Sequence, residues 1–402
     1  MKKIKFLSVA ILPIAAITTV VSCSNNTSSN TTKTAITAKS PRIALTDPEN
    51  PRWVQAQEKF LANFDSLNQG AAALLAKTQT EQNAWLDTAI SAGTEGLIIG
   101  SINGEQLGNQ LRAAKNKKIP VVAYDRLIKG TSDYDWYLTY DNSKVGTIQG
   151  LSLASSLLGK EGEIFKTAGE AVAYLKQHPL TENKIVLLMG GALSDNNAKL
   201  FFNGAMDVIN KLINETKNSQ FKIMIKGRES VEQVLQNDWD YTEGQNRLSA
   251  SITALTSDEK LQIRGILAPN DGMAQAAVAS LKANGVDAKK VYITGQDFND
   301  YIKPLIKNGE VNMTIYKPDN ELSFASIALL NILIAENKKT DGQTKLTTEQ
   351  IFEQVKTQFE TKFSGKTMTL DLEQYKKTDT ESVFTILLTP QAVTKANIDS
   401  FN

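Results

Sequence analysis

The chain has 402 residues, 41% of them hydrophobic and 22% charged, which is the composition of a globular protein with enough apolar residues for two lobes. The 44 Lys and Arg residues balance 43 Asp and Glu residues, so the net charge does not favour a nucleic-acid partner. Cys23 and His178 are the only residues of their types, which excludes a disulfide within the chain and a Cys/His metal site.

The N-terminus has the pattern of an export signal. The basic segment MKKIK precedes an apolar stretch that ends at Cys23 and is shorter than the roughly 20 residues of a spanning helix. This pattern resembles a bacterial lipoprotein leader, so we expect residues 1–23 to be a signal peptide ending at the acylated Cys23. An uncleaved membrane anchor is the alternative. Residues 24–40 are rich in Ser, Thr and Asn and are expected to form a flexible tether.

From Pro41 onward, short apolar runs alternate with amphipathic stretches. The apolar runs are continuous, which is typical of parallel strands covered by helices on both faces. The first half predicts strands in residues 42–46, 71–77, 96–101 and 119–125, and helices in 53–64, 84–93 and 104–118.

After Asp141 the same alternation starts again. This second half predicts strands in residues 184–191, 221–227, 264–269 and 291–296, and helices in 144–158, 198–213, 244–255 and 272–285. The predicted fold class is therefore α/β, with two doubly wound parallel-sheet lobes joined by a hinge. Residues 161–180 and 338–381 interrupt the alternation, and we expect both to be surface additions, with His178 in a solvated loop.

Polar residues cluster where several predicted strands end, in the segments AYDR, GGALSDNN, APND, TGQD and IYKPDN. Parallel sheets bind ligands beyond the carboxyl ends of their strands. Carboxylates, amides and fixed cations suit the hydroxyl groups of a sugar, and aromatic rings suit the faces of its ring. The candidate residues are Arg52, Trp53, Asp125, Arg126, Asp195, Asn196, Asn197, Asn270, Asp271, Asp297 and Lys317.

Each candidate also has a purely structural explanation. Asp195, Asn270 and Asp271 precede predicted helices and could be N-caps. Arg126 and Lys317 could be surface charges, and Trp53 could belong to the core. The repetition of polar clusters at one edge of successive strands favours a ligand site.

Enzyme chemistry has less support. The segment after Gly190 and Gly191 lacks the Lys-Ser/Thr ending of a phosphate loop, and no G-x-S-x-G nucleophile motif is present. Paired carboxylates could in principle hydrolyse a glycoside, but the fold pattern and the leader favour capture of a ligand. We therefore expect a binding protein with no catalytic residue, cofactor or metal.

Several segments, in this order, resemble the D-xylose-binding proteins of sugar ABC transporters, within the ribose/galactose-type periplasmic binding proteins. They are IPVVAYDRLI, YLTYDNSKVG, IVLLMGGALSDNNAKLF, ILAPNDGMAQAA, ITGQDFN, MTIYKPDN and the C-terminal VFTILLTPQAVTKANID. The resemblance covers residues 41–337 and 382–402. It implies a type I periplasmic-binding-protein fold that closes on a pentose, expected to be D-xylose, for delivery to an ABC permease.

The resemblance also implies roles for individual residues. Arg52, Asp125 and Arg126 would bind the sugar from one lobe, and Asp195, Asn197, Asn270, Asp297 and Lys317 would close over it from the other. Trp239 would be the stacking aromatic residue. The implied N-terminal lobe is 41–141 plus 318–337, the implied C-terminal lobe is 142–317 plus 382–402, and 338–381 is an insertion at or beyond the third hinge strand.

The resulting expectation is a monomeric lipoprotein on the outer face of the cell membrane. Another sugar, such as ribose, arabinose or galactose, is one alternative ligand. A surface adhesin or sensor lipoprotein on the same fold is an alternative of a different class.

Overall fold

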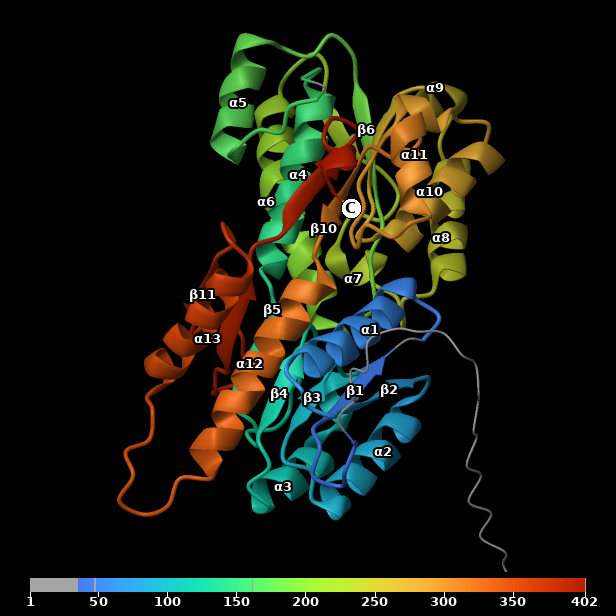
Figure 1. The fold of residues 1–402 in the computed structure, drawn as a ribbon. Coiled ribbons are helices and arrows are strands. Elements are labelled where there is room, and N and C mark those ends of the chain that lie inside the picture. Colours follow the sequence, from blue (N-terminus) through green and yellow to red (C-terminus); the bar gives the residue numbers. More distant parts are fainter. Residues whose placement is uncertain (1–34, 47, 161, 402) are drawn as a thin grey trace, which may run out of the picture. The chain divides into compact units, whose positions relative to one another are not determined.

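The computed structural model describes residues 35–46, 48–160 and 162–401, in which strands and helices alternate to form two lobes (Figure 1). The predicted lipidation site Cys23 lies outside the described residues. Within the described ranges, no helix is both long enough and apolar enough to cross a membrane.

The first lobe is built on a seven-stranded sheet with the order β11-β12-β5-β4-β3-β1-β2. All neighbouring strands are parallel except β11, which runs antiparallel to β12 at the edge. The strands are β1 (Arg42–Thr46), β2 (Ala72–Ala76), β3 (Leu97–Ile99), β4 (Val121–Tyr124), β5 (Trp136–Tyr140), β11 (Met368–Asp371) and β12 (Phe384–Leu388).

Helices cover both faces of this sheet, which explains why its strands are continuously apolar. Ile43 and Leu45 of β1 share one buried cluster with residues of α1, α12 and α13, whereas Ala44 shares another with residues of α2 and α3. Successive strand side chains point to opposite faces, so one apolar run fills both clusters. The helices are α1 (Pro51–Ser66), α2 (Gln79–Ala92), α3 (Gly108–Asn116), α12 (Asp319–Asn337) and α13 (Thr348–Lys362), with a short turn η1 (Gly104–Gln106).

The second lobe has a four-stranded parallel sheet with the order β7-β6-β8-β9 and an antiparallel pair β10-β13. Its strands are β6 (Lys184–Leu188), β7 (Ile223–Ile225), β8 (Ile263–Leu267), β9 (Tyr292–Ile293), β10 (Met313–Tyr316) and β13 (Gln391–Thr394). Its longer helices are α4 (Asn142–Leu157), α5 (Ala168–Gln177), α6 (Asn196–Thr216), α8 (Tyr241–Thr253), α10 (Asp271–Ala283) and α11 (Ile302–Asn308). The short ones are α7 (Val231–Val234), α9 (Ser257–Lys260), η2 (Ala288–Lys290) and η3 (Ile398–Ser400).

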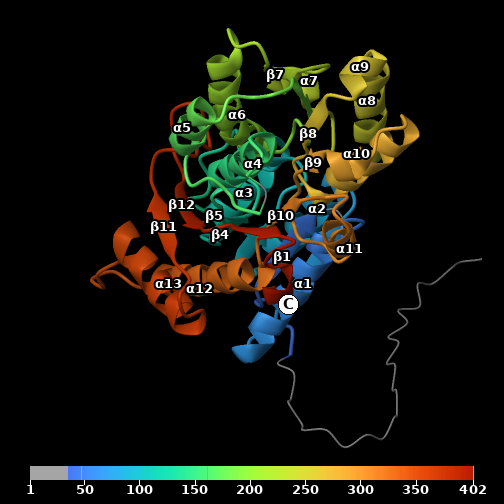
Figure 2. The ribbon, with the colours of Figure 1, turned by 90° about the horizontal axis from the view of Figure 1, so that it is seen from above.

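The chain passes between the two lobes three times. It crosses at Asp141 between β5 and α4, at Lys317 and Pro318 between β10 and α12, and at Thr389 and Pro390 between β12 and β13. Seen from above, α12 and α13 lie at the left of the view and α10 at the right (Figure 2).

The third crossing differs from the sequence expectation. Residues 382–402 were expected in the C-terminal lobe, but β12 pairs in parallel with β5 in the first sheet, and only β13 and the residues after it join the second lobe. The insertion 338–381 was expected at or beyond the third hinge strand. Its elements α13 and β11 instead precede that crossing and pack on the first lobe. In the other added segment, α5 ends at an exposed His178 that stacks on Tyr174.

Candidate functional site

The strand-end loops of both lobes meet around one small cavity of about 20 Å³. At least 10 to 15 Å³ is needed to hold one water molecule, so this conformation is closed too tightly for a sugar. The cavity is lined by Asn50, Arg52, Trp53, Asp125, Arg126, Asp195, Asn197, Phe201, Trp239, Asn270, Gln296, Asp297 and Lys317.

Two residues named from the sequence do not line this cavity. Asn196 is the first residue of α6 and is absent from the lining, while its neighbours Asp195 and Asn197 are present. Asp271 lies buried behind the cavity, where Thr314 Oγ1 donates to its Oδ1 at 2.7 Å and the Asn299 amide donates to its Oδ2 at 2.8 Å. Asp271 therefore supports the loop that follows β9.

Arg52 is the centre of the charge network in the first lobe. Its guanidinium donates to both carboxylate oxygens of Asp125, at 3.1 and 2.6 Å, in the bidentate geometry that orients both groups. Its Nη2 also lies 3.5 Å from Asp319 Oδ1, and its Nε lies 3.9 Å from Asp297 Oδ1 in the second lobe. The Arg52 Nε is a buried donor with no hydrogen-bond partner among the described residues, and Arg52 lines the cavity.

Arg126 connects the two lobes directly. Its Nε lies 3.2 Å from Asp195 Oδ2, and its Nη1 donates to the carbonyl of Ser101 at 3.3 Å. The Trp239 indole Nε1 donates to the same Asp195 oxygen at 3.2 Å. The Trp53 ring lies beneath both guanidinium groups, 4.8 Å from Arg52 Cζ and 5.2 Å from Arg126 Cζ, which are cation–π distances.

A second connection between the lobes forms at the backbone of Asp125. Its carbonyl accepts hydrogen bonds from Asn197 Nδ2 at 2.9 Å, from the Tyr137 hydroxyl and from Thr139 Oγ1 at 3.0 Å. Asn197 Oδ1 in turn accepts from Asn142 Nδ2 at 2.9 Å. Asp125 has a φ of +59°, a left-handed conformation that non-glycine residues adopt rarely and that this carbonyl network holds in place.

Asp297 and Lys317 approach the cavity from the second lobe and the hinge. Asp297 Oδ1 lies 3.7 Å from Lys317 Nζ, and Lys317 Nζ lies 5.5 Å from the centre of the Phe201 ring. Asp297 also has a positive φ, +99°, so Asp125 and Asp297 both have an unusual backbone conformation. Such outliers concentrate at functional sites.

The capping explanation is confirmed for two of these residues. Asp195 Oδ1 accepts the Asn197 amide at 3.0 Å and Asn270 Oδ1 accepts the Met273 amide at 3.0 Å, so both residues are N-caps. Their remaining polar atoms face the cavity side, where Asn270 Nδ2 donates to the Tyr241 hydroxyl at 3.2 Å. Asn50, the N-cap of α1, reaches the same hydroxyl at 3.4 Å from the other lobe.

Helix α6 carries Asn197 and Phe201 on one face and is held in position by close packing on α4. A Cβ on Gly146 would lie 2.0 Å from the Phe201 carbonyl oxygen, and one on Gly204 would lie 2.3 Å from the Ser143 carbonyl oxygen. The absence of side chains at these glycines lets the two backbones touch, which fixes the position of Phe201 in the cavity wall.

Charge and burial oppose each other at these residues. Burial alone would raise the pKa of Asp125, but Arg52 and Lys317 outweigh it and hold that pKa well below its usual range. Burial and the nearby Arg52 lower the pKa of Lys317. Burial raises the pKa of Asp319 to about 6, against the opposing effect of Arg52. Asp319 begins α12 directly after the second crossing and accepts the Tyr124 hydroxyl at 2.9 Å.

The raised pKa of Asp319 predicts a pH dependence of stability. Between its ordinary pKa of 3.8 and its folded pKa of about 6, the folded chain holds a proton that the unfolded chain has lost. The wild type should therefore lose stability relative to Asp319→Asn as the pH rises from 4 to 7. At about 1.4 kcal/mol per pKa unit, the change is about 2 kcal/mol. Urea unfolding of both proteins from pH 4 to 7 measures this change in the free energy of unfolding. A difference in unfolding free energy between wild type and Asp319→Asn that stays constant from pH 4 to 7 would contradict the raised pKa of Asp319.

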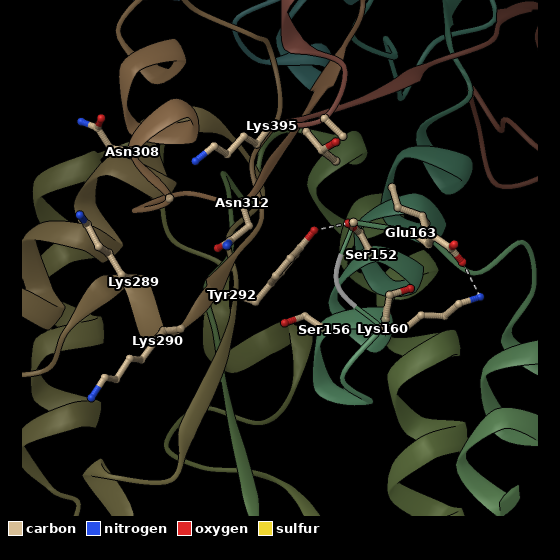
Figure 3. Close-up of a pocket in the computed structure, with 17 residues that line it drawn as sticks. Ser152, Ser156, Lys160, Glu163, Lys289, Lys290, Tyr292, Asn308, Asn312 and Lys395 are labelled. Carbon is tan, nitrogen blue, oxygen red and sulfur yellow. Dashed lines mark hydrogen bonds and ion pairs between the residues drawn. The ribbon is translucent and has the colours of Figure 1, made fainter. Parts of the chain in front are cut away.

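A second cavity, of about 540 Å³, lies in the second lobe at the opposite end of its strands (Figure 3). Ser152 Oγ and the Tyr292 hydroxyl are hydrogen-bonded there at 2.5 Å, and Lys160 pairs with Glu163 at 2.7 Å. The side chains of Lys289 and Lys290 diverge in Figure 3. The polar groups of this cavity do not converge on one point as those of the cavity between the lobes do.

Comparison with known proteins agrees with the fold. Residues 43–339 match the model of the family described as "Periplasmic binding protein domain". The chain is 38% identical over 384 residues to the 46 kDa surface antigen of Mesomycoplasma hyopneumoniae, covering 92% of this chain and 89% of that protein. It is 30% identical over 307 residues to the D-xylose-binding periplasmic protein of Haemophilus influenzae, covering 76% and 80%.

Among solved structures, the chain resembles an ABC transporter solute-binding protein from Clostridium phytofermentans with bound β-D-glucose. The TM-score is 0.71 at 22% identity, and the match covers 90% of this chain and 96% of that chain. This likeness shows the type I periplasmic-binding-protein fold that the sequence predicts. With the family model covering most of both lobes, this chain belongs to the periplasmic binding protein domain family.

Proposed function

We propose that this chain is the extracytoplasmic solute-binding protein of a sugar ABC importer and that it captures a monosaccharide, D-xylose, between its lobes. The observation that carries the proposal is the convergence of buried polar side chains from both lobes on one cavity. Capture and release by lobe closure is the general mechanism of periplasmic binding proteins. The proposal assigns the chain no catalytic residue.

The chemistry of the lining favours a neutral polyhydroxylated ligand. Arg52, Arg126 and Lys317 can donate to hydroxyl oxygens, and Asp125, Asp195 and Asp297 can accept from hydroxyl protons. These three cations and three carboxylates balance in charge, so neither an anion nor a cation is favoured. Trp53, Phe201 and Trp239 add apolar surface for the C–H faces of a sugar ring.

The choice of D-xylose rests on the motif resemblance and on the relatives named as D-xylose-binding proteins. Hexoses are the competing ligands, because solved structures of this fold carry D-glucose. We further propose that Cys23 is lipidated and holds a monomeric chain at the outer face of the membrane, beside its permease. The 38% identity to a surface antigen supports a surface location and keeps an adhesin as the second candidate function.

Isothermal titration calorimetry of the purified chain with D-xylose, D-ribose, L-arabinose, D-glucose and D-galactose tests the proposal. We expect saturable binding of D-xylose at micromolar affinity, about −8 kcal/mol, and at least tenfold weaker binding of hexoses. L-leucine, a zwitterion, serves as the control and should give no heat. If only a hexose gives a saturable heat of binding, the proposal of sugar capture stands and D-xylose is rejected as the ligand. Flat titrations for every sugar would reject sugar capture and favour the adhesin.

A further inference from the structure

Residues 366–377, which we call the arm, contact the structure around all three crossings between the lobes. The arm contains β11 and the turn after it, at the end of the insertion. In Figure 1, α13 and β11 lie on one side of the connections between the lobes, and α1 and α8 lie on the other.

At the first crossing, the arm touches the start of the second lobe. Gln374 Nε2 donates to Ser143 Oγ of α4 at 3.1 Å. Tyr375 is 1% exposed, and its ring packs edge-on against Tyr137 of the first lobe at 5.3 Å. Its hydroxyl has no hydrogen-bond partner among the described residues. Gln374 therefore bridges the two lobes directly at the hinge, and Tyr375 anchors the arm in the first lobe.

At the second crossing, the arm contacts the first turn of α12. Lys366 Nζ lies 3.2 Å from Glu321 Oε1, and Glu321 Oε2 accepts the Tyr140 hydroxyl at 3.4 Å. The same hydroxyl donates to the carbonyl of Pro318 at 3.0 Å, which ties the end of β5 to the crossing itself. At the third crossing, Met368 of β11 pairs with Leu388 of β12, one residue before Thr389.

The order of strands in the first sheet places the crossings between the candidate site and the arm. Arg52 follows β1 and Asp125 follows β4, whereas β5 and β12 lead into crossings and β11 lies beyond them at the edge. Rotation about these crossings that widens the cleft on the site side must bring the second lobe toward the arm. Leu200 of α6 already packs against the first-lobe cluster that contains Tyr375.

We propose that the arm is a stop behind the hinge, which limits how far the two lobes can open. Packed side chains are nearly incompressible, so an opening rotation can continue only until the second lobe, whose Ser143 contacts Gln374, is packed against the arm. A restricted open state raises the share of conformations that can close on a ligand, and apparent affinity rises with that share. The effect on affinity rests on the proposed sugar binding, but the limit on opening does not.

The test measures the opening of the ligand-free protein and its affinity for D-xylose separately. Spin labels at Lys59→Cys on α1 and Lys282→Cys on α10, in a chain carrying Cys23→Ser, give the distance between the lobes by double electron–electron resonance. Both labelling positions are exposed. The test variant is Gln374→Ala/Tyr375→Leu, and Gln374→Ala alone is the milder variant, which keeps the buried aromatic ring. Glu373→Ala, at the exposed neighbouring residue, is the matched control.

The double variant should show longer distances without sugar, the wild-type distance at saturating sugar, and affinity about three- to tenfold weaker. Gln374→Ala should shift both quantities less and in the same direction, and Glu373→Ala should shift neither. Ligand-free distances that coincide with the wild type, or become shorter, would overturn the stop. If the wild type binds no sugar, the proposed function fails, and the ligand-free distances still decide the inference.

Discussion

Replacing Asp297 by alanine is expected to weaken the binding of D-xylose strongly. The Asp297 carboxylate lies 3.7 Å from Lys317 Nζ and 3.9 Å from Arg52 Nε, and all three side chains are buried. The variant loses an acceptor for the ligand and leaves two buried cations without this carboxylate. Such a loss costs about 2 to 5 kcal/mol, or a factor of about 30 to several thousand in affinity. Calorimetric titration measures it.

The matched control for this variant is Asp300→Ala, three residues along the same loop. Asp300 is 84% exposed and pairs with Lys303 at 2.8 Å, a surface pair of small energetic value. Its affinity should equal that of the wild type. A melting temperature near the wild-type value would show that Asp297→Ala still folds. Binding within fivefold of the wild type in a folded Asp297→Ala protein would remove Asp297 from the proposed site.

Arg126→Ala should lose affinity to a similar extent for a different reason. Arg126 is the first-lobe partner of Asp195 across the cleft, at 3.2 Å, with both side chains at least nine-tenths buried. Its loss removes a donor to the ligand and leaves the Asp195 carboxylate with the Trp239 indole and the Asn197 amide as its partners among the described residues. Closure becomes less favourable, so small-angle X-ray scattering of the ligand-free variant should give a larger radius of gyration than the wild type.

Arg112→Ala is the matched control, because Arg112 belongs to the same lobe and pairs with Asp133 at the surface. Neither its affinity nor its scattering curve should change. Arg126→Lys should recover little binding, because a lysine cannot reproduce the planar guanidinium over Trp53. Wild-type affinity of the lysine variant would mean that only the charge at this position matters.

The repeated alternation of strands and helices was sufficient to predict two parallel α/β lobes, because continuous apolar runs reflect burial on both faces. It was not sufficient to place the last strands. The run that forms β12 is as apolar as the strands of either sheet, and its partner β5 lies more than 200 residues earlier. Local sequence does not encode such a pairing, so the segment was assigned to the wrong lobe.

The candidate site was predictable where polar residues end a strand, as at Asp125 and Asp297. Asn196 does not line the cavity, because successive helix residues point in directions about 100° apart and the helix that aims Asn197 at the cavity turns Asn196 away. Phe201 was missed although it lies four residues after Asn197 and so shares its helix face. Asn50 was missed although it caps the first helix, the same signal that marked Asp195 and Asn270.

The C-terminal segment divides its two strands between the lobes. Strand β12 completes the first sheet beside β5, and β13 pairs with β10, while Val393 and Ile398 fill the second-lobe core. During synthesis, β5 and β10 therefore have an unpaired edge until residues 384–398 are made. Unpaired strand edges promote aggregation. Neither lobe can complete its strand pairing before this segment is made, and a chain truncated in this region would leave both lobes incomplete.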